Sequence, residues 1–414
     1  MLKGEQKMKK RWPLVAIPAG LILAMGFMFS NTAQLAAQKV ENINGMRVVH
    51  NRGKGVWGRQ PAVKLEPVLK LGDIDSPDEH TAFYIPAAVA VDKAGNIYVL
   101  DSGNNRLQKF SADGKFLASF GRFGQGPGEF IYPSWLAIDS SGNLYVSDPH
   151  NRRLQILGSD GKDLKTIKFA DLEMGNILVA TNGNLLMPEP AIIFSFAGKE
   201  KEKTGKLPGL IKVMDPTGKV IQEIGERLDM KDELLTNTIN SAFMTLDKND
   251  HVYLVFPYQN RIEKYSAEGQ LIWRASRELP YSLEVQDKGN IERRGNSLSI
   301  REPKINRSSL SVAVDGQERV WVLTLARQLK KEEQAGIGVS IGSVDGKQQV
   351  GYKVIGDTDL RKTDAYKLEV FDPEGILLGE IPLEIFVDHI FIYGDRLFLL
   401  DKLHGATVHI FQIR

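Results

Sequence analysis

Short runs of apolar residues, separated by turn residues, follow one another along most of the chain. Residues 88–101 hold two such runs on either side of an Asp-x-x-Gly-Asn turn that begins at Asp92. Alternating apolar residues around a tight, Gly-containing turn are typical of a β-hairpin. Two further runs flank an Asp-Gly turn at Asp113 and Gly114. The pattern therefore predicts four antiparallel strands in succession.

This four-strand unit repeats after 47 residues, the spacing from Asp92 to Asp139. Four antiparallel strands at such a period are the signature of a propeller blade. Weaker copies of the inner hairpin are centred on residues 182–184, 248–250, 315–317 and 394–395. Six copies predict an all-β fold, a six-bladed β-propeller with four-stranded antiparallel blades.

The last blade is one strand short, because the chain ends at Arg414 just after a strand at residues 407–413. An apolar-alternating stretch at residues 63–71 precedes the first complete blade and provides the missing outer strand. Closure by this N-terminal strand pairs edges that would otherwise stay open. We therefore assign residues 61–414 to the propeller and residues 39–60 to an extended segment before it.

The first 38 residues are typical of an export signal. Four basic residues between Lys7 and Arg11 precede an almost uncharged apolar run at residues 13–29, followed by a short polar stretch. Cleavage is expected after Ala33 or Ala37. The alternative is an uncleaved membrane anchor, because the apolar run approaches the length that spans a bilayer. Either reading places the propeller outside the cytoplasm, as a periplasmic, secreted or membrane-anchored protein.

Composition and charge argue against several classes of function. The chain has 414 residues and no Cys, which excludes disulfides, thiol catalysis and thiolate metal sites. Residues 1–38 hold five of the 53 basic and one of the 51 acidic residues, so 48 and 50 remain in the exported part. A domain without excess positive charge argues against nucleic acid as a partner.

Part of the chain resembles a known repeat family. Residues 96–110, followed by residues 124–130, look like the NHL repeat, and the second blade matches through Asp148, Asn151 and Arg152. The resemblance implies a six-bladed propeller. Because the NHL family includes binding modules, RNA readers and a peptide-amidating lyase, it does not identify the function.

Strand order indicates where function lies. In a four-stranded blade, the loops between the second and third strands share one face with the connections between blades, which we call the site face. Long loops in compact domains tend to carry function. The long loops all fall on this face, at residues 122–133, 189–210, 226–241, 278–308 and 326–366.

Aromatic and basic side chains on the site face are candidates for binding. Trp, Tyr and Arg are the residue types that most often anchor ligands and partners. The candidates are Arg122, Tyr132, Trp135, Arg152, Tyr258, Arg261 and Arg327. For Trp135, on an inner strand, burial in the core is the alternative.

Histidines supply a second hypothesis. Four of the seven fall on site-face loops of neighbouring blades, and grouped imidazoles ligate zinc. They are His80, His150, His389 and His404. A zinc or calcium site here would make the protein a metal-dependent lyase or hydrolase. No paired His-x-x-His or Glu-x-x-His spacing supports it, so coincidence stays the alternative and our first expectation is no cofactor.

Other charged residues have structural interpretations. Asp101, Asp148 and Asp401 recur at the end of the second strand, where a carboxylate accepts loop N–H groups and pairs with Arg. The mixed-charge runs at residues 199–203 and 330–333 predict solvated loops. The Gly-rich stretch at residues 336–350 predicts either an extra hairpin or a lid.

The sequence thus favours an exported binding module that engages a protein, peptide or glycan through the site face. The alternative is a metal-dependent enzyme that uses the histidines. A membrane contact is expected only through an uncleaved N-terminal segment, and the sequence does not predict the oligomeric state.

Overall fold

The computed structural model describes residues 38–58, 60–169, 176–189, 207–294, 297–344 and 347–414. The export segment therefore lies almost wholly outside the described residues, as do the charged run at 199–203 and most of the 189–210 loop. Among the described residues, none of the helices has the length and hydropathy needed to cross a bilayer.

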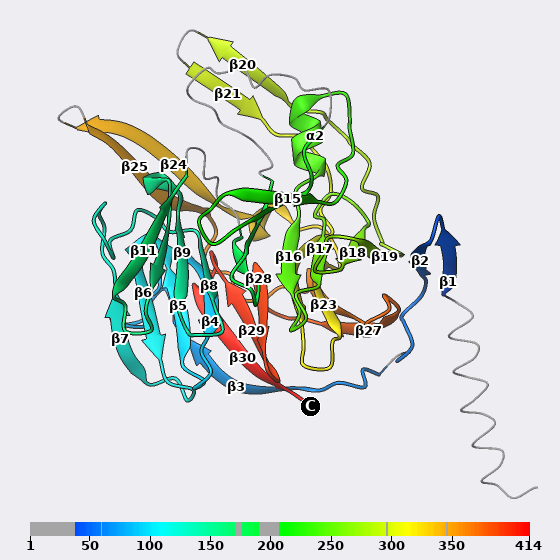
Figure 1. The fold of residues 1–414 in the computed structure, drawn as a ribbon, viewed down its shortest axis with the longest axis horizontal. Helices are drawn as coiled ribbons and strands as arrows, with labels where there is room; N and C mark the ends of the chain where they lie inside the picture. The colour runs from blue at the N-terminus through cyan, green and yellow to red at the C-terminus, as the bar shows by residue number, and fades with distance from the viewer. Residues whose placement is uncertain (1–37, 59, 170–175, 190–206, 295–296, 345–346) are drawn as a thin grey trace, which may run out of the picture.

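Six antiparallel sheets form the blades (Figure 1). Blade one contains β4 (Pro86–Val91), β5 (Ile97–Asp101), β6 (Arg106–Phe110) and β7 (Phe116–Phe120). Blade two contains β8 (Trp135–Ile138), β9 (Leu144–Asp148), β10 (Arg153–Leu157) and β11 (Asp163–Lys168). Blade three contains β12 (Leu178–Val179), β13 (Leu185–Pro188), β14 (Ile211–Met214) and β15 (Val220–Ile224). Short 3₁₀ turns, η1 (Ser102–Asn104) and η2 (Pro149–Asn151), join the middle strands of blades one and two.

The other three blades carry additions. Blade four contains β16 (Phe243–Leu246), β17 (Val252–Val255), β18 (Ile262–Tyr265) and β19 (Leu271–Arg277). Blade five contains β22 (Ser309–Val314), β23 (Val320–Leu325), β26 (Tyr366–Phe371) and β27 (Leu377–Pro382). Blade six contains β28 (His389–Tyr393), β29 (Arg396–Asp401), β30 (Thr407–Ile413) and β3 (Leu65–Leu71). The predicted six-bladed propeller with four-stranded blades is confirmed.

Burial falls from the inside of each blade outward. In blade one, every residue of β5 is buried, whereas β7 alternates between partly buried and exposed positions. Inner strands pack against neighbouring blades on both faces, which is why they are continuously apolar instead of alternating. The core therefore lies between adjacent blades, around large buried side chains such as Tyr98, Phe110 and Trp321.

The Asp-x-x-Gly-Asn turns have a local physical cause. Asp92 Oδ1 accepts the backbone N–H groups of Ala94 and Asn96, each at 2.9 Å. Gly95 has φ +84°, a backbone conformation that costs little free energy because glycine has no Cβ. Asp139 makes the equivalent bonds in blade two. The Asp side chain holds the loop, and the Gly allows the chain to reverse direction. These local residues therefore fix the hairpin register.

The N-terminal strand closes the ring. β3 pairs antiparallel with β30, with Leu71 opposite Val408 and Leu69 opposite Ile410. Leu71 and Val408 are both buried, so this pairing covers an apolar edge. The closure expected from residues 63–71 is therefore present, with the strand beginning at Leu65.

The segment before the closing strand is more ordered than the sequence suggests. β1 (Lys39–Ile43) and β2 (Met46–Asn51) form a hairpin, and β2 pairs in parallel with β19, which extends blade four to six strands. The chain then crosses blade five, where Trp57 N donates to Leu378 O at 2.6 Å. Residues 39–58 therefore bind the propeller edge along blades four and five, before β3 in blade six.

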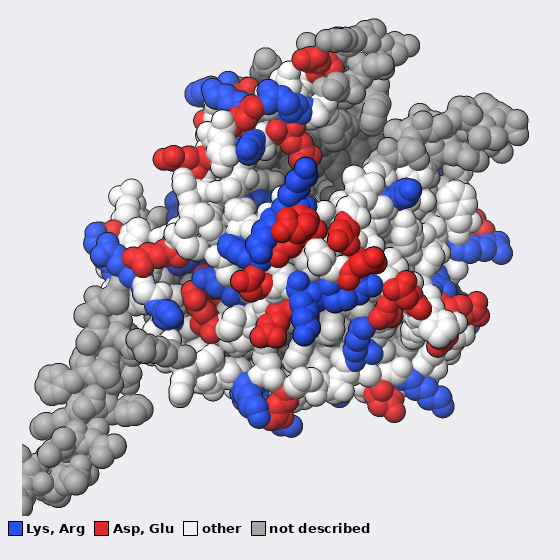
Figure 2. Space-filling view, turned by 180° about the vertical axis from the view of Figure 1, so that it is seen from behind, with Lys and Arg blue, Asp and Glu red and all other residues white. Residues whose placement is uncertain are grey.

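Acidic and basic side chains are interspersed over the face shown in Figure 2, without a broad area of one sign.

The recurrent Asp residues hold the loops together. Asp101 is fully buried, accepts the backbone N–H of Tyr84 at 2.8 Å and pairs with Arg106 Nε at 2.8 Å. Burial raises the pKa of Asp101, and these donors oppose the rise. Its amide partner is Asn104, at 2.8 Å.

The residues next to these partners have other roles. The amide partner in blade one is Asn104, and the guanidinium partner in blade two is Arg153. Arg152 and Asn105 are the left-handed residues that end the two 3₁₀ turns, so their side chains point elsewhere. Asn105 instead accepts the backbone N–H of Tyr132 at 2.6 Å, which links blade one to the next connection.

Replacing either Asp is expected to weaken the fold. Asp101→Ala and Asp148→Ala should each lower the free energy of unfolding by about 1–3 kcal/mol, because buried N–H donors lose their acceptor. Asp113→Ala, in an exposed turn, is the matched control and should change it by less than about 0.5 kcal/mol. Urea unfolding of the three variants checks this; equal losses in all three would contradict the structural role.

Candidate functional site

Three insertions rise from one face of the ring, the upper side in Figure 1. They are α2 (Glu233–Ile239) and the hairpin β20 (Asn290–Arg294) with β21 (Ser297–Arg301), both in connections between blades, and the longer hairpin β24 (Ala335–Val344) with β25 (Lys347–Gly356). We call this longer hairpin the arm. It joins the second and third strands of blade five, so it shares the face of the blade connections, as strand order predicts.

The arm confirms the extra hairpin expected near residues 336–350, whereas α2 and β20–β21 were not predicted. It reaches from blade five to the first two blades. Tyr352 Oη lies 2.6 Å from His150 Nε2, and its ring lies 4.2 Å from that of Tyr132. At its base, His404 Nε2 lies 3.1 Å from the backbone oxygen of Glu333, the last residue of the 3₁₀ turn η3 (Lys331–Glu333). The arm is thus held above the site face near its base and through Tyr352, in the middle of β25.

Three aromatic rings close the site-face end of the central channel. Trp135, Phe243 and His389 are the first residues of β8, β16 and β28, the inner strands of blades two, four and six. The His389 ring lies 5.5 Å from that of Trp135 and 5.6 Å from that of Phe243, both edge-on. We call this group the aromatic plug. Because inner strands begin at the site face, the plug forms the floor of that face.

Beneath the plug is a cavity of about 200 Å³. It is lined mainly by apolar residues of β8, β12, β16, β22 and β28, with Trp135 at its edge. Trp135 Nε1 and His389 Nδ1 are both buried, and neither has a hydrogen-bond partner among the residues that the structure describes. Unpaired buried polar atoms are uncommon in native proteins, and two on adjacent rings mark the plug as unusual.

A lysine stands beside the plug. Lys402 follows β29. Burial lowers the pKa of His389 to about 3, and the charge of Lys402 contributes to this fall. Burial also lowers the pKa of Lys402, and Asp388 opposes this. Asp388 Oδ2 accepts the backbone N–H of Lys402 at 2.6 Å. The Lys402 ammonium has no hydrogen bond or ion pair within the described part of the chain.

Asp401 precedes Lys402 and is the last residue of β29 in blade six. Burial, together with the neighbouring charge of Asp388, raises its pKa to about 7. Its oxygens accept the N–H groups of His404 at 2.9 Å and Gly405 at 2.7 Å. Asp401 is thus a structural residue of the loop, as its repeat position suggested.

The structure separates the seven predicted binding residues. Tyr132 contacts the arm and Trp135 belongs to the plug. Arg122 is exposed and pairs with Glu129 at 2.7 Å, and Arg152 is exposed as well. Neither of these arginines approaches the channel through any described contact.

Two other arginines have structural partners. Arg327 binds Glu333 at 2.6 Å and lowers the pKa of that carboxyl to about 2. The prediction of a fully solvated loop at residues 330–333 is therefore wrong for Glu333, which is buried because Arg327 and Thr363 satisfy it. Arg261 is buried against the Phe256 ring at 3.9 Å.

Tyr258 is half-buried in the loop between β17 and β18, and burial raises its pKa. Within the same loop, Arg261 Nε and Nη2 have no hydrogen-bond partner in the described part of the chain. Glu263 Oε1 is 3.6 Å from Arg261 Nε, and burial lowers the pKa of the guanidinium. These two residues lie in blade four, away from the arm contacts.

The four candidate histidines are not brought together. His80 stacks on Phe116 at 3.7 Å and His404 stacks on Phe386 at 3.6 Å. His150 contacts the arm, and His389 lies in the plug. Among the described residues, no three His, Asp or Glu side chains are placed to hold a metal ion.

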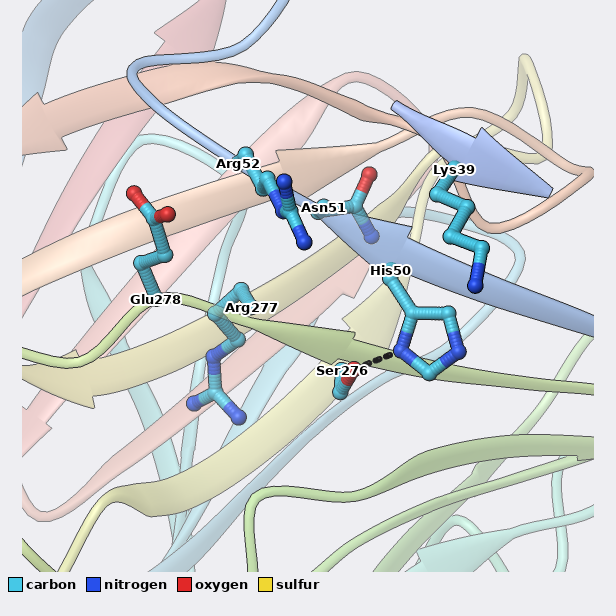
Figure 3. Close-up of a pocket in the computed structure, with 7 residues that line it drawn as sticks. All are labelled: Lys39, His50, Asn51, Arg52, Ser276, Arg277 and Glu278. Carbon is cyan, nitrogen blue, oxygen red and sulfur yellow. Dashed lines mark hydrogen bonds between the residues drawn. The ribbon is translucent and has the colours of Figure 1, made fainter. Parts of the chain in front are cut away.

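A second cavity, of about 300 Å³, lies where the N-terminal hairpin meets blade four (Figure 3). His50 Nδ1 is 3.1 Å from Ser276 Oγ across the seam. Arg277 turns away from the hairpin in Figure 3, toward Glu369 at 2.7 Å in the interior. We interpret this cavity as a gap in the structural contact between the N-terminal hairpin and blade four.

Comparison with known proteins agrees with the fold. Residues 82–277 match the family model DUF5128, described as a 6-bladed beta-propeller. The chain is a six-bladed β-propeller. A search of curated proteins gives no match. The family match supports the propeller prediction but does not name the NHL repeat, so that resemblance stays a prediction.

Solved structures show the same architecture. A member of the duf4221 family from Bacteroides vulgatus is 11% identical, with 85% of this chain and 98% of that chain covered and a TM-score of 0.52. A structure described as "Putative exported protein" from Bacteroides fragilis is 12% identical, with 89% and 99% covered and a TM-score of 0.52. At such identities the likeness extends to the fold alone.

Sequence reasoning missed Phe243 and Lys402 in this propeller. Phe243 occupies the same strand position as Trp135 and His389, so aligning the first residue of each inner strand would have found it. Lys402 follows the repeat Asp401 directly, a position to which blades one and two give Ser102 and Pro149. The change from a neutral residue to a cation was the available signal.

Proposed function

We propose that this propeller is an exported binding module that takes up an extracytoplasmic ligand on its site face. The ligand would lie on the aromatic plug, between the arm on one side and α2 with β20–β21 on the other. Binding is preferred to catalysis because the candidate histidines have separate contacts, and among the described residues no three His, Asp or Glu side chains are placed to hold a metal ion.

One observation carries the proposal. The floor of the site face combines large rings with polar groups that have no partner among the described residues, namely Trp135 Nε1, both ring nitrogens of His389 and the Lys402 ammonium. A fold that needed these residues only for packing would have satisfied or removed their polar atoms. Apolar surface with a few convergent polar groups is typical of ligand sites.

Export has independent support. The basic and apolar pattern of residues 1–38 predicts a signal or anchor, and the absence of Cys suits a domain stabilised by packing alone. One of the structures that share the fold is itself described as exported. Fractionation of cells that express the full chain would locate it; a cytoplasmic location would contradict this part of the proposal.

A defined panel tests the binding proposal. The full-length protein is immobilised and probed with synthetic peptides and purified oligosaccharides, and each hit is remeasured with Phe243→Ala and with Lys93→Ser. Lys93 is exposed in a hairpin turn on the opposite face and serves as the control. We expect Phe243→Ala to weaken binding at least tenfold and Lys93→Ser to leave it unchanged. The reverse pattern would place the ligand on the other face.

A further inference from the structure

We propose that the floor of the site face is an oxyanion site, in which Lys402 and His389 bind a carboxylate or phosphate group carried on a flat apolar body. This inference rests on the proposed function, because it names the chemistry that the same face recognises.

The first donor is the Lys402 ammonium. Lys402 as a residue is half-buried, and its ammonium has no acceptor in the described part of the chain, although the Asp388 carboxylate is a neighbour. Asp388 is engaged by the backbone N–H of Lys402 at 2.6 Å, and no ion pair joins it to the ammonium. A half-buried cation without a direct partner is costly, and an anionic ligand removes that cost.

The second donor is His389 Nε2. Nδ1 is buried without a partner, whereas Nε2 is not among the fully buried unpaired atoms, and the residue is partly exposed. We assign the N–H to Nε2, because the proton can then meet solvent or ligand, while at Nδ1 it would be a buried donor without an acceptor. The ring is neutral at pH 7, since burial and Lys402 hold its pKa near 3. Both groups are therefore donors, which selects an acceptor such as an oxyanion.

The surroundings favour a ligand with an apolar body. The Trp135 and Phe243 rings flank His389 at 5.5 and 5.6 Å, so a group bound to the two donors would lie against aromatic surface. Aromatic contacts of this kind contribute through both area and ring geometry. A small inorganic anion would make the polar contacts without these.

Matched small probes separate the polar and apolar parts. Benzoate, phenyl phosphate and benzyl alcohol share a ring, but only the first two carry an oxyanion, and acetate carries the oxyanion without a ring. Saturation-transfer NMR titrations use the full-length protein. We expect benzoate or phenyl phosphate to bind at least tenfold more tightly than benzyl alcohol and acetate, because hydrogen bonds to charged groups are the strong ones. The preferred oxyanion tells a carboxylate ligand from a phosphate one.

Variants assign the effect to the site. Lys402→Gln should weaken the preferred oxyanion roughly tenfold and leave benzyl alcohol unchanged, while Lys93→Gln on the opposite face should change neither. His389→Phe, which replaces the imidazole with another aromatic ring, should weaken oxyanion binding by a smaller factor than Lys402→Gln. If Lys402→Gln unfolds the protein, salt provides the second measurement, since affinity for the wild-type protein should fall as ionic strength rises. Equal binding of all four probes, or no effect of Lys402→Gln on a folded protein, would overturn the proposal.

The two proposals fail separately. In one outcome, panel ligands bind and Phe243→Ala weakens them, but neither Lys402→Gln nor competition by benzoate or phenyl phosphate changes their binding. The oxyanion site is then wrong, and the binding module stands. If the oxyanion binds through Lys402 while no peptide or oligosaccharide does, the site stands and the ligand is a small molecule.

Discussion

Deletion of residues 1–75 is expected to abolish the folded propeller. The deletion removes β3, so the outer edge of β30 loses its pairing, and the buried Val408 and Ile410 lose contact with Leu71 and Leu69. Each buried aliphatic side chain is worth roughly 1.5–3 kcal/mol, which approaches the net stability of a whole domain when several are lost together. An open apolar edge also invites aggregation. Soluble yield and thermal melting of the purified chain measure the effect.

Two shorter deletions are the controls. Removal of residues 1–37 leaves every strand in place and should give a soluble protein with a single cooperative transition. Removal of residues 1–62 keeps β3 but loses the β1–β2 hairpin and the Trp57 contact with blade five, so we expect an intermediate melting temperature. If all three truncations melt alike, ring closure by β3 does not stabilise the fold.

Glu369→Ala is expected to destabilise the propeller by about 3–5 kcal/mol. Glu369 is fully buried in blade five and accepts from Arg277 Nε of blade four at 2.7 Å and from Thr324 Oγ1 at 2.8 Å. Burial would raise its pKa, but Arg277 and Lys367 hold the pKa of Glu369 below its ordinary value. Removing the carboxylate leaves the buried Arg277 guanidinium without its counter-ion, which is far more costly than breaking a surface pair. Urea unfolding gives the loss.

Glu380→Ala is the matched control for this network. Glu380 pairs with Lys367 from the neighbouring strand but is partly exposed, so its removal should cost less than about 1 kcal/mol. A Glu369→Ala protein as stable as Glu380→Ala would show that the Arg277–Glu369 pair does not join blades four and five.

Blades one and two could be predicted from the sequence because the residues that fix their hairpins are close together along the chain. The Asp92 and Asp139 turns set the hairpin register within five residues, so a sequence pattern suffices. The pairing of β2 with β19 joins residues more than two hundred positions apart, and no local pattern encodes it. The same holds for the contact between Tyr352 and His150. Such non-local pairings follow only once the ring has placed the blades.

The candidate site was predicted in part for the same reason. Strand order identified the face from which α2, β20–β21 and the arm rise, because it depends on connectivity alone. It did not identify which side chains converge on the axis, so Trp135 was assigned to binding without its neighbours Phe243 and His389. Residue type alone does not predict the partners of an arginine, such as the buried carboxylate of Glu333 beside Arg327.

Hydrogen exchange of the full-length protein, with and without the tightest ligand of the panel, tests the central claim most directly. Bound ligand should slow amide exchange on the site face, at the start of β28, in residues 401–406 and in the connection before β8. The hairpin turns on the opposite face, at residues 92–96, 139–143 and 247–251, should exchange as in the free protein. Protection confined to those turns would contradict the assignment of function to the site face.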